Sequence, residues 1–125
     1  REKIMSWTLR NEFRLNLDGV DWDSQPVSTW DTDFTYNYTP MLNKAFALAG
    51  LTEKFEDHFH DLHGMNNIEA GPVILQVYVA MLTYKLSIEE LQPDNGWGTY
   101  EQLLDRVKDM LVRNTTCLNK NFVWC

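Results

Sequence analysis

The spacing of apolar residues predicts four helices in the last two-thirds of the chain. In each segment apolar positions recur every three or four residues, as in a helix that buries one face. Glycine or proline-containing turns separate the segments. The predicted helices span residues 39–49, 52–63, 68–86 and 99–114. The segment 68–86 is apolar nearly all round, so we expect it to be the most buried helix, with Leu75, Val77, Met81 and Leu82 in the core.

The first third of the chain has weaker signals and predicts only a minor β element. Apolar and polar residues alternate over Phe13–Leu17, which favours a strand, whereas 1–13 fits either a short helix or the start of a strand. The polar and aromatic stretch 21–38 reads as a long ordered loop with one short strand near Phe34. The apolar tail 121–125 is expected to pair as an edge strand. The predicted fold class is mainly α: a small bundle of about four helices with a minor β element near the N-terminus.

Length and charge limit the classes of protein. A chain of 125 residues without repeats or linkers fits a single domain, with an N-terminal extension (1–33), a helical core (34–117) and a tail (118–125). Its longest apolar stretch is about half the length that crosses a bilayer, so we expect no membrane partner. The net charge of −7 argues against binding a nucleic-acid backbone and is compatible with a basic protein partner. The sequence leaves open whether Cys117 and Cys125 form a disulfide.

Motifs for catalysis are missing from the sequence. It contains neither a G-x-S-x-G nucleophile motif nor a glycine-rich phosphate loop, so we expect no catalytic residue and no cofactor. All three histidines, His58, His60 and His63, fall in one predicted helix, where Asp57 and His60 imitate the carboxylate–histidine pair of metal sites. A metal would need a further ligand from another helix, and no second such motif exists. We therefore expect an exposed polar helix face without a metal, and keep a metal-dependent enzyme as the alternative.

Two clusters of aromatic and polar residues precede predicted helices, over 34–41 and 93–100. Helix N-termini carry free N–H groups and the positive end of the helix dipole, which favour an anion or a carbonyl. Aromatic faces beside amides also suit a nucleobase, through stacking and edge hydrogen bonds. The alternative is that these side chains only pack and hold the loops. If both helix starts lie at the same end of the bundle, the predicted ligand-binding residues are Tyr36, Asn37, Asn95, Trp97 and Tyr100.

The same clusters carry a resemblance to a known family. The run Thr35-Tyr36-Asn37-Tyr38-Thr39-Pro40-Met41, the pair Gly64-Met65 and the run Pro93-Asp94-Asn95-Gly96-Trp97-Gly98-Thr99-Tyr100 are similar to motifs of small uncharacterised proteins of phages, prophages and bacterial genomes. The likeness covers about residues 34–117, and Gln92 stands where that family has Asn. It implies a mobile-element origin and a setting in the host bacterial cytoplasm, and it supplies no mechanism.

We therefore expect a non-enzymatic binding protein of phage or mobile-element origin. By analogy with small phage proteins, it would act against host defence by sequestering a nucleotide-like small molecule or by covering a host protein. Besides the metal-dependent enzyme, a second alternative is a structural or assembly protein that forms a homo-oligomer through its aromatic tail.

Overall fold

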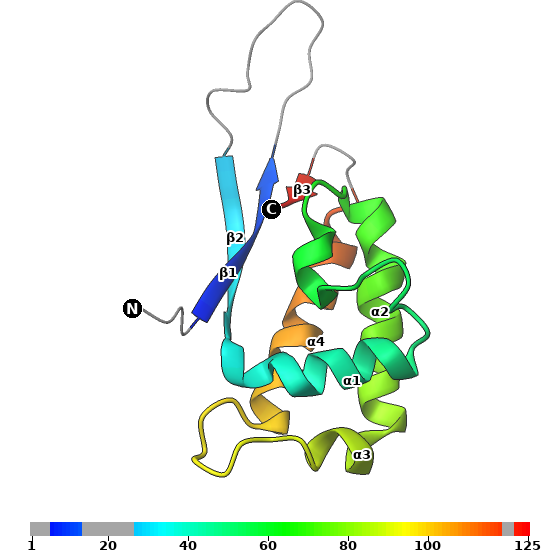
Figure 1. Cartoon of the computed structure of the whole chain (residues 1–125). Helices are drawn as coiled ribbons and strands as arrows, with labels where there is room; N and C mark the ends of the chain where they lie inside the picture. The colour runs from blue at the N-terminus through cyan, green and yellow to red at the C-terminus, as the bar shows by residue number, and fades with distance from the viewer. Residues whose placement is uncertain (1–5, 14–26, 119–121) are drawn as a thin grey trace, which may run out of the picture.

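A computed structural model describes residues 6–13, 27–118 and 122–125, and it shows a mixed α/β domain (Figure 1). Four α-helices pack with a three-stranded antiparallel sheet. The mainly α prediction is therefore wrong, because the chain before the first helix builds two long strands rather than a minor element.

The sheet has the order β2-β1-β3, with β1 in the middle. β1 (Ser6–Phe13) pairs antiparallel with β2 (Val27–Thr35), with Trp7 opposite Phe34. On its other edge β1 pairs with β3 (Phe122–Trp124). The tail strand is thus confirmed. The predicted strand Phe13–Leu17 lies outside the described residues except for Phe13, the last residue of β1.

The sequence predicts β1 only as one of two alternatives and β2 only as a short strand near Phe34, because polar residues occupy part of the buried face of both strands. Along β1 the buried positions include Leu9 and Asn11, and along β2 they include Thr32 and Phe34. Asparagine and threonine in these inward positions interrupt the alternation of apolar and polar residues from which a strand is read. The pattern therefore predicts a loop over 21–38 with only one short strand near Phe34, whereas β2 occupies residues 27–35 of that segment.

The helices follow the predicted signals where capping residues are present. α1 (Thr39–Leu48) begins with proline in its first turn, and α4 (Tyr100–Thr116) begins with a capping box between Thr99 and Gln102. Both predicted helices are confirmed. α2 (Asn67–Thr83) is capped by the Asn66 side chain, and it ends at Tyr84 before the short α3 (Lys85–Glu89).

The predicted helix 52–63 is wrong. That segment forms turns and a short 3₁₀ helix, η2 (His58–Leu62). His58 has a φ of 42°, in the left-handed region that a regular right-handed helix does not allow. Phe55, Phe59 and Leu62 are nonetheless buried. Their apolar spacing reflects packing into the core rather than an α-helix.

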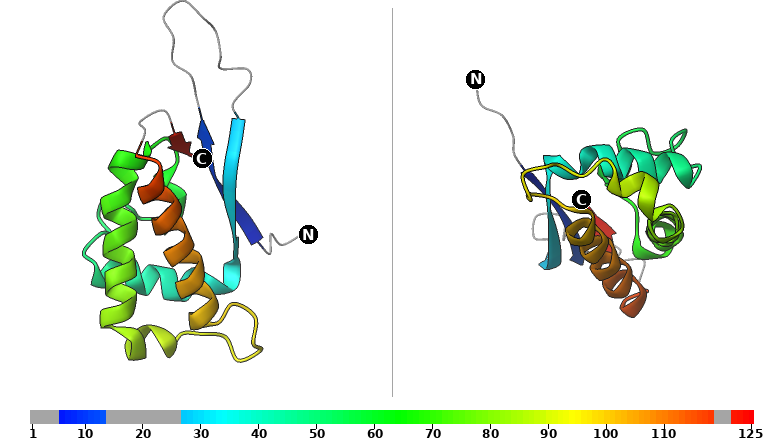
Figure 2. Two further views of the ribbon diagram at one scale, coloured as in Figure 1. Left: turned by 180° about the vertical axis from the view of Figure 1, so that it is seen from behind. Right: turned by 90° about the horizontal axis from the view of Figure 1, so that it is seen from below.

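α2 and α4 run side by side in opposite directions, and the sheet stands on the far side of α4 from α2 (Figure 2). Val77 and Met81 of α2 are fully buried, as predicted. Leu75 and Leu82 are 48% and 51% exposed, so their predicted burial is wrong. Only one face of α2 packs on the rest of the domain, although both the inward and the outward face of the helix carry apolar residues.

A buried polar network joins the sheet to the helix ends. Asn11 of β1 and Asn67 of α2 exchange two side-chain hydrogen bonds of 2.8 and 3.2 Å. Asn67 also donates to the carbonyl of Cys117, and Asn114 donates to the carbonyl of Asn67. The Trp124 indole of β3 donates to Asn114. The apolar tail is therefore part of the domain's own core.

Two further features bear on the sequence predictions. No disulfide joins Cys117 to Cys125. Among the helices within the described ranges, none has both the length and the apolar character that crossing a membrane requires.

Candidate functional site

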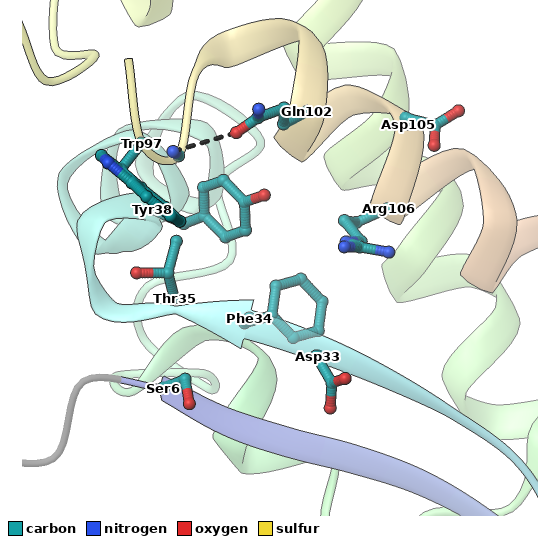
Figure 3. Close-up of a pocket in the computed structure, with 10 residues that line it drawn as sticks. Ser6, Asp33, Phe34, Thr35, Tyr38, Trp97, Gln102, Asp105 and Arg106 are labelled. Carbon is teal, nitrogen blue, oxygen red and sulfur yellow. Dashed lines mark hydrogen bonds between the residues drawn. The ribbon is translucent and has the colours of Figure 1, made fainter. Parts of the chain in front are cut away.

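A surface cleft of about 410 Å³ lies where the end of β2, the short 3₁₀ helix η1 (Tyr36–Tyr38), the loop before α4 and α4 itself meet (Figure 3). Trp97 stands at one end of the cleft, and Asp105 and Arg106 of α4 stand toward the other. The rings of Tyr38 and Phe34 lie between them and are almost completely buried. The cleft is lined by Ser6, Asp33, Phe34, Thr35, Tyr38, Trp97, Gly98, Gln102, Asp105 and Arg106.

The backbone of the loop that carries Trp97 is held on both sides. The Trp97 N–H donates to the Asn95 side chain at 3.0 Å, and the Asn37 amide donates to the Trp97 carbonyl at 3.3 Å. The second bond links η1 to the loop across 60 positions of sequence. It shows that the two aromatic–polar clusters meet. The Trp97 side chain itself remains 73% exposed.

Gly98 lets this loop approach η1 closely. Its φ is +75°, and a Cβ atom placed on it would lie 2.9 Å from Cβ of Asn37 and 3.0 Å from Cγ2 of Thr35. Any other residue would have both an unfavourable backbone conformation and a steric clash. The close contact between this loop and η1 therefore depends on glycine at this position.

The polar groups at the start of α4 are used to form the loop. The Gln102 side-chain oxygen accepts from the N–H groups of Gly98 and Thr99 at 2.9 and 3.1 Å. The Gln92 side chain accepts from the Tyr100 N–H at 3.1 Å. Because these side chains occupy the first free N–H groups, that end of α4 is already capped by the protein itself.

The charges of the cleft are mixed in sign. Asp33 and Asp105 supply carboxylates, and the Asp33 carboxylate accepts from the Thr8 hydroxyl at 2.6 Å. Arg106 supplies a guanidinium that makes no ion pair within the part of the chain the structure describes. A bound molecule would therefore meet two carboxylates, one guanidinium without an ion-pair partner among the described residues, and the exposed indole of Trp97.

The structure separates the five predicted ligand-binding residues. Trp97 lines the cleft. Asn37 and Asn95 hold the loop and do not line the cleft, and Tyr36 is 38% exposed but lies outside the lining. Tyr100 is fully buried, with its hydroxyl donating to the Met81 carbonyl at 2.6 Å, so it packs in the core.

Sequence reasoning missed most of the cleft. Phe34 and Tyr38 belong to the first aromatic–polar cluster but are not among the predicted ligand-binding residues, and their place in the cleft depends on β2 and η1. Asp105 and Arg106 sit on the exposed face of a helix whose apolar face was recognised. No motif distinguishes these two residues from other surface charges on α4.

The histidine segment is arranged differently from the prediction of an exposed helix face. His58 is only 2% exposed and packs near Trp7, Phe46 and His60. The candidate ligand atoms of Asp57, His58 and His60 lie within 4.8 Å of one another, which is close enough to consider a metal.

The hydrogen bonding of His58 argues for packing instead. Its Nδ1 accepts from the Phe59 N–H at 2.8 Å, so the neutral ring carries its proton on Nε2. That nitrogen lies 4.0 Å from Asp57 and has no lone pair for an ion in this tautomer. Burial, aided by the neighbouring His60, lowers the pKa of His58 from 6.5 to about 4. The ring is therefore neutral near pH 7.

The structure is a small α/β domain with a surface cleft that has the exposed Trp97 at one end. Comparison with protein-family models, with curated proteins and with solved structures gives no match to this chain.

Proposed function

We propose that this chain is a non-enzymatic binding protein whose ligand site is the Trp97 cleft. The observation that carries the proposal is the bond from Asn37 to the Trp97 carbonyl. It fixes the loop backbone while the indole stays 73% exposed at the mouth of a cleft. An exposed tryptophan on a loop held at both sides is a preformed surface for stacking, because little backbone freedom remains to be lost on binding.

The ligand class that fits is a nucleotide-like small molecule. A planar base would stack on the indole, a sequence-tolerant interaction worth about 1–3 kcal/mol. Its amino groups would donate to the carboxylates of Asp33 or Asp105, and its phosphate would pair with the Arg106 guanidinium. A ligand that carries hydrogen-bond donors on its base and an anionic phosphate on its sugar matches the mixed charge of the cleft better than a simple anion does.

The biological setting is proposed from the resemblance of the two aromatic–polar motifs to phage-encoded proteins. In the cytoplasm of a bacterial host, such a protein would act against defence by sequestering a signalling nucleotide. Alternatively, the exposed Trp97 would bind a host protein and cover it. Tryptophan is enriched among interface hot spots, which supports this second possibility.

A fluorescence titration tests the ligand site. The chain has five tryptophans, so the titration compares wild type with Trp97→Phe and assigns the change to Trp97. Adenosine and guanosine monophosphates and a cyclic dinucleotide serve as probes. We expect at least one probe to quench wild-type fluorescence, and Trp97→Ala to weaken its binding by roughly 1–3 kcal/mol. Arg106→Gln should weaken binding of the nucleotide but not binding of the corresponding nucleoside, which has no phosphate.

Tyr36→Ala is the matched control, because Tyr36 belongs to the same motif and is exposed but lies outside the cleft. It should bind as wild type does. If no probe binds, or if Tyr36→Ala and Trp97→Ala have equal effects, the nucleotide site is wrong.

A further inference from the structure

The outward face of α2 carries an apolar seam. Its residues are Ile68, Pro72, Leu75, Val79 and Leu82, and every one of them is exposed. Their spacings of four, three, four and three residues are those of the a and d positions of a heptad repeat. In a helix that meets only water on this side, such positions are normally polar. The seam is therefore the pattern of a helix that packs against another helix.

Within the described part of the chain, no element covers this seam. Two hollows border it: one of about 750 Å³ between α2 and the end of α4, and one of about 390 Å³ on the side of α1. Leu75 lines both hollows, so it forms the ridge between them. A ridge flanked by two grooves is the surface into which a second ridged helix fits.

We propose that two copies of this chain pair through the α2 seam, with their α2 helices antiparallel. Charge favours a second copy at this face. The chain carries a net charge of −7, and two like-charged copies repel each other over most of their surface. The sequence of α2 contains one charged residue, Glu69, whereas α4 contains six. Two copies therefore bring fewer like charges together at α2 than at α4.

The seam is also complementary to itself. In an antiparallel pair each a position faces a d position of the other helix. Val79 then packs against the partner's Leu75, and Leu82 against the partner's Pro72, with both contacts repeated by the two-fold axis. The pairing centres on residue 77, close to the middle of α2, so the helices overlap along most of their length. The isologous contact closes on itself and produces a dimer rather than a filament.

The size of the contact indicates a weak dimer. A standard interface buries roughly 800 Å² on each partner, and one helix of 17 residues is only about 25 Å long. For a contact confined to this helix and its bordering hollows, we therefore expect an area at the low end of specific interfaces. We expect a dissociation constant in the micromolar range rather than an obligate dimer.

Analytical ultracentrifugation of the full chain from about 1 μM to about 1 mM tests the pairing. Wild type should pass from monomer to dimer in this range. Leu75→Glu and Val79→Glu should each weaken the dimer by more than about tenfold, with unchanged circular dichroism because both side chains are exposed. Leu91→Glu, at an exposed leucine outside the seam, should dimerise as wild type does. A chain that stays monomeric throughout, or a dimer unaffected by both seam variants, overturns the proposal.

Disulfide trapping tests the antiparallel register. In a background with Cys117→Ser and Cys125→Ser, a mixture of Leu75→Cys and Val79→Cys chains should cross-link faster than either variant alone. Cross-linking mainly within each variant would show a parallel pair and overturn the register. Because none of the seam residues lines the Trp97 cleft, these results are independent of the proposed ligand site.

Discussion

Replacing Asn67 with alanine should destabilise the domain far more than an ordinary surface change. Asn67 is fully buried at the start of α2, and its side chain makes three hydrogen bonds: two with Asn11 of β1 and one with the carbonyl of Cys117 after α4. One carboxamide therefore connects the sheet with the ends of both long helices. Asn67→Ala removes all three bonds and leaves a small void.

The expected cost follows from the groups that lose a partner. A typical hydrogen bond contributes about 1 kcal/mol net, but a buried group deprived of its partner costs about 1–3 kcal/mol. Three bonds at a buried site give roughly 3–6 kcal/mol. This is a large fraction of the 5–15 kcal/mol by which domains are typically stable.

Urea unfolding monitored by circular dichroism measures this cost, and Asn66→Ala is the matched control. Asn66 is the neighbouring residue, and its side chain caps α2 by accepting from the Glu69 N–H at 2.9 Å. Loss of that cap should cost about 1 kcal/mol. The double variant Asn11→Ala/Asn67→Ala should cost less than the sum of the single variants, because both act on the same bonds. If Asn67→Ala costs no more than Asn66→Ala, the network does not hold the sheet to the helices.

Two further predictions concern His58 and Gly98. Since the pKa of His58 is lowered from 6.5 to about 4, stability should fall by roughly 3 kcal/mol as the pH falls from about 6.5 to about 4, where only the unfolded chain binds the proton. In unfolding curves measured across that pH range, His58→Asn should abolish this pH-dependent loss of stability. His63→Asn, at an exposed histidine, should retain the loss. Identical pH profiles for the two variants would contradict the assignment of the loss to His58. Gly98→Ala should cost about 1–3 kcal/mol more in thermal unfolding than Gly50→Ala, because both glycines have φ near +75° but only Gly98 has a neighbour within 4 Å. Equal costs would show that the loop yields without strain.

The parts of the fold that were predictable are those where local chemistry and packing agree. Around α4, the capping box of Thr99 and Gln102 and the apolar spacing from Leu103 onward indicate the same helix. In the segment 52–63 the apolar spacing is equally regular, but the left-handed backbone at His58 prevents a helix. Spacing alone cannot reveal a backbone conformation that only the surrounding core stabilises.

The burial of polar side chains limited the prediction of both the sheet and the site. Asn11 and Thr32 lie on the inward face of the strands, where an apolar residue is expected, and the tertiary contact with Asn67 explains why Asn11 is tolerated there. In the site, Trp97 was identified from its motif, but Asn37 proved to hold the loop through its own amide. Whether an asparagine binds a ligand or the backbone depends on a partner 60 positions away.

The position of β3 has a consequence for how fast the domain forms. β3 lies between β1 and the segment before α2: Arg10 and Cys125 exchange backbone hydrogen bonds of 2.9 Å, and Trp124 bonds to the backbone of Gly64 and Met65. The central strand is thus completed only when residues more than a hundred positions apart have met. Folding rates fall as the average sequence separation of contacts rises. This domain should therefore fold more slowly than a helical bundle of the same length.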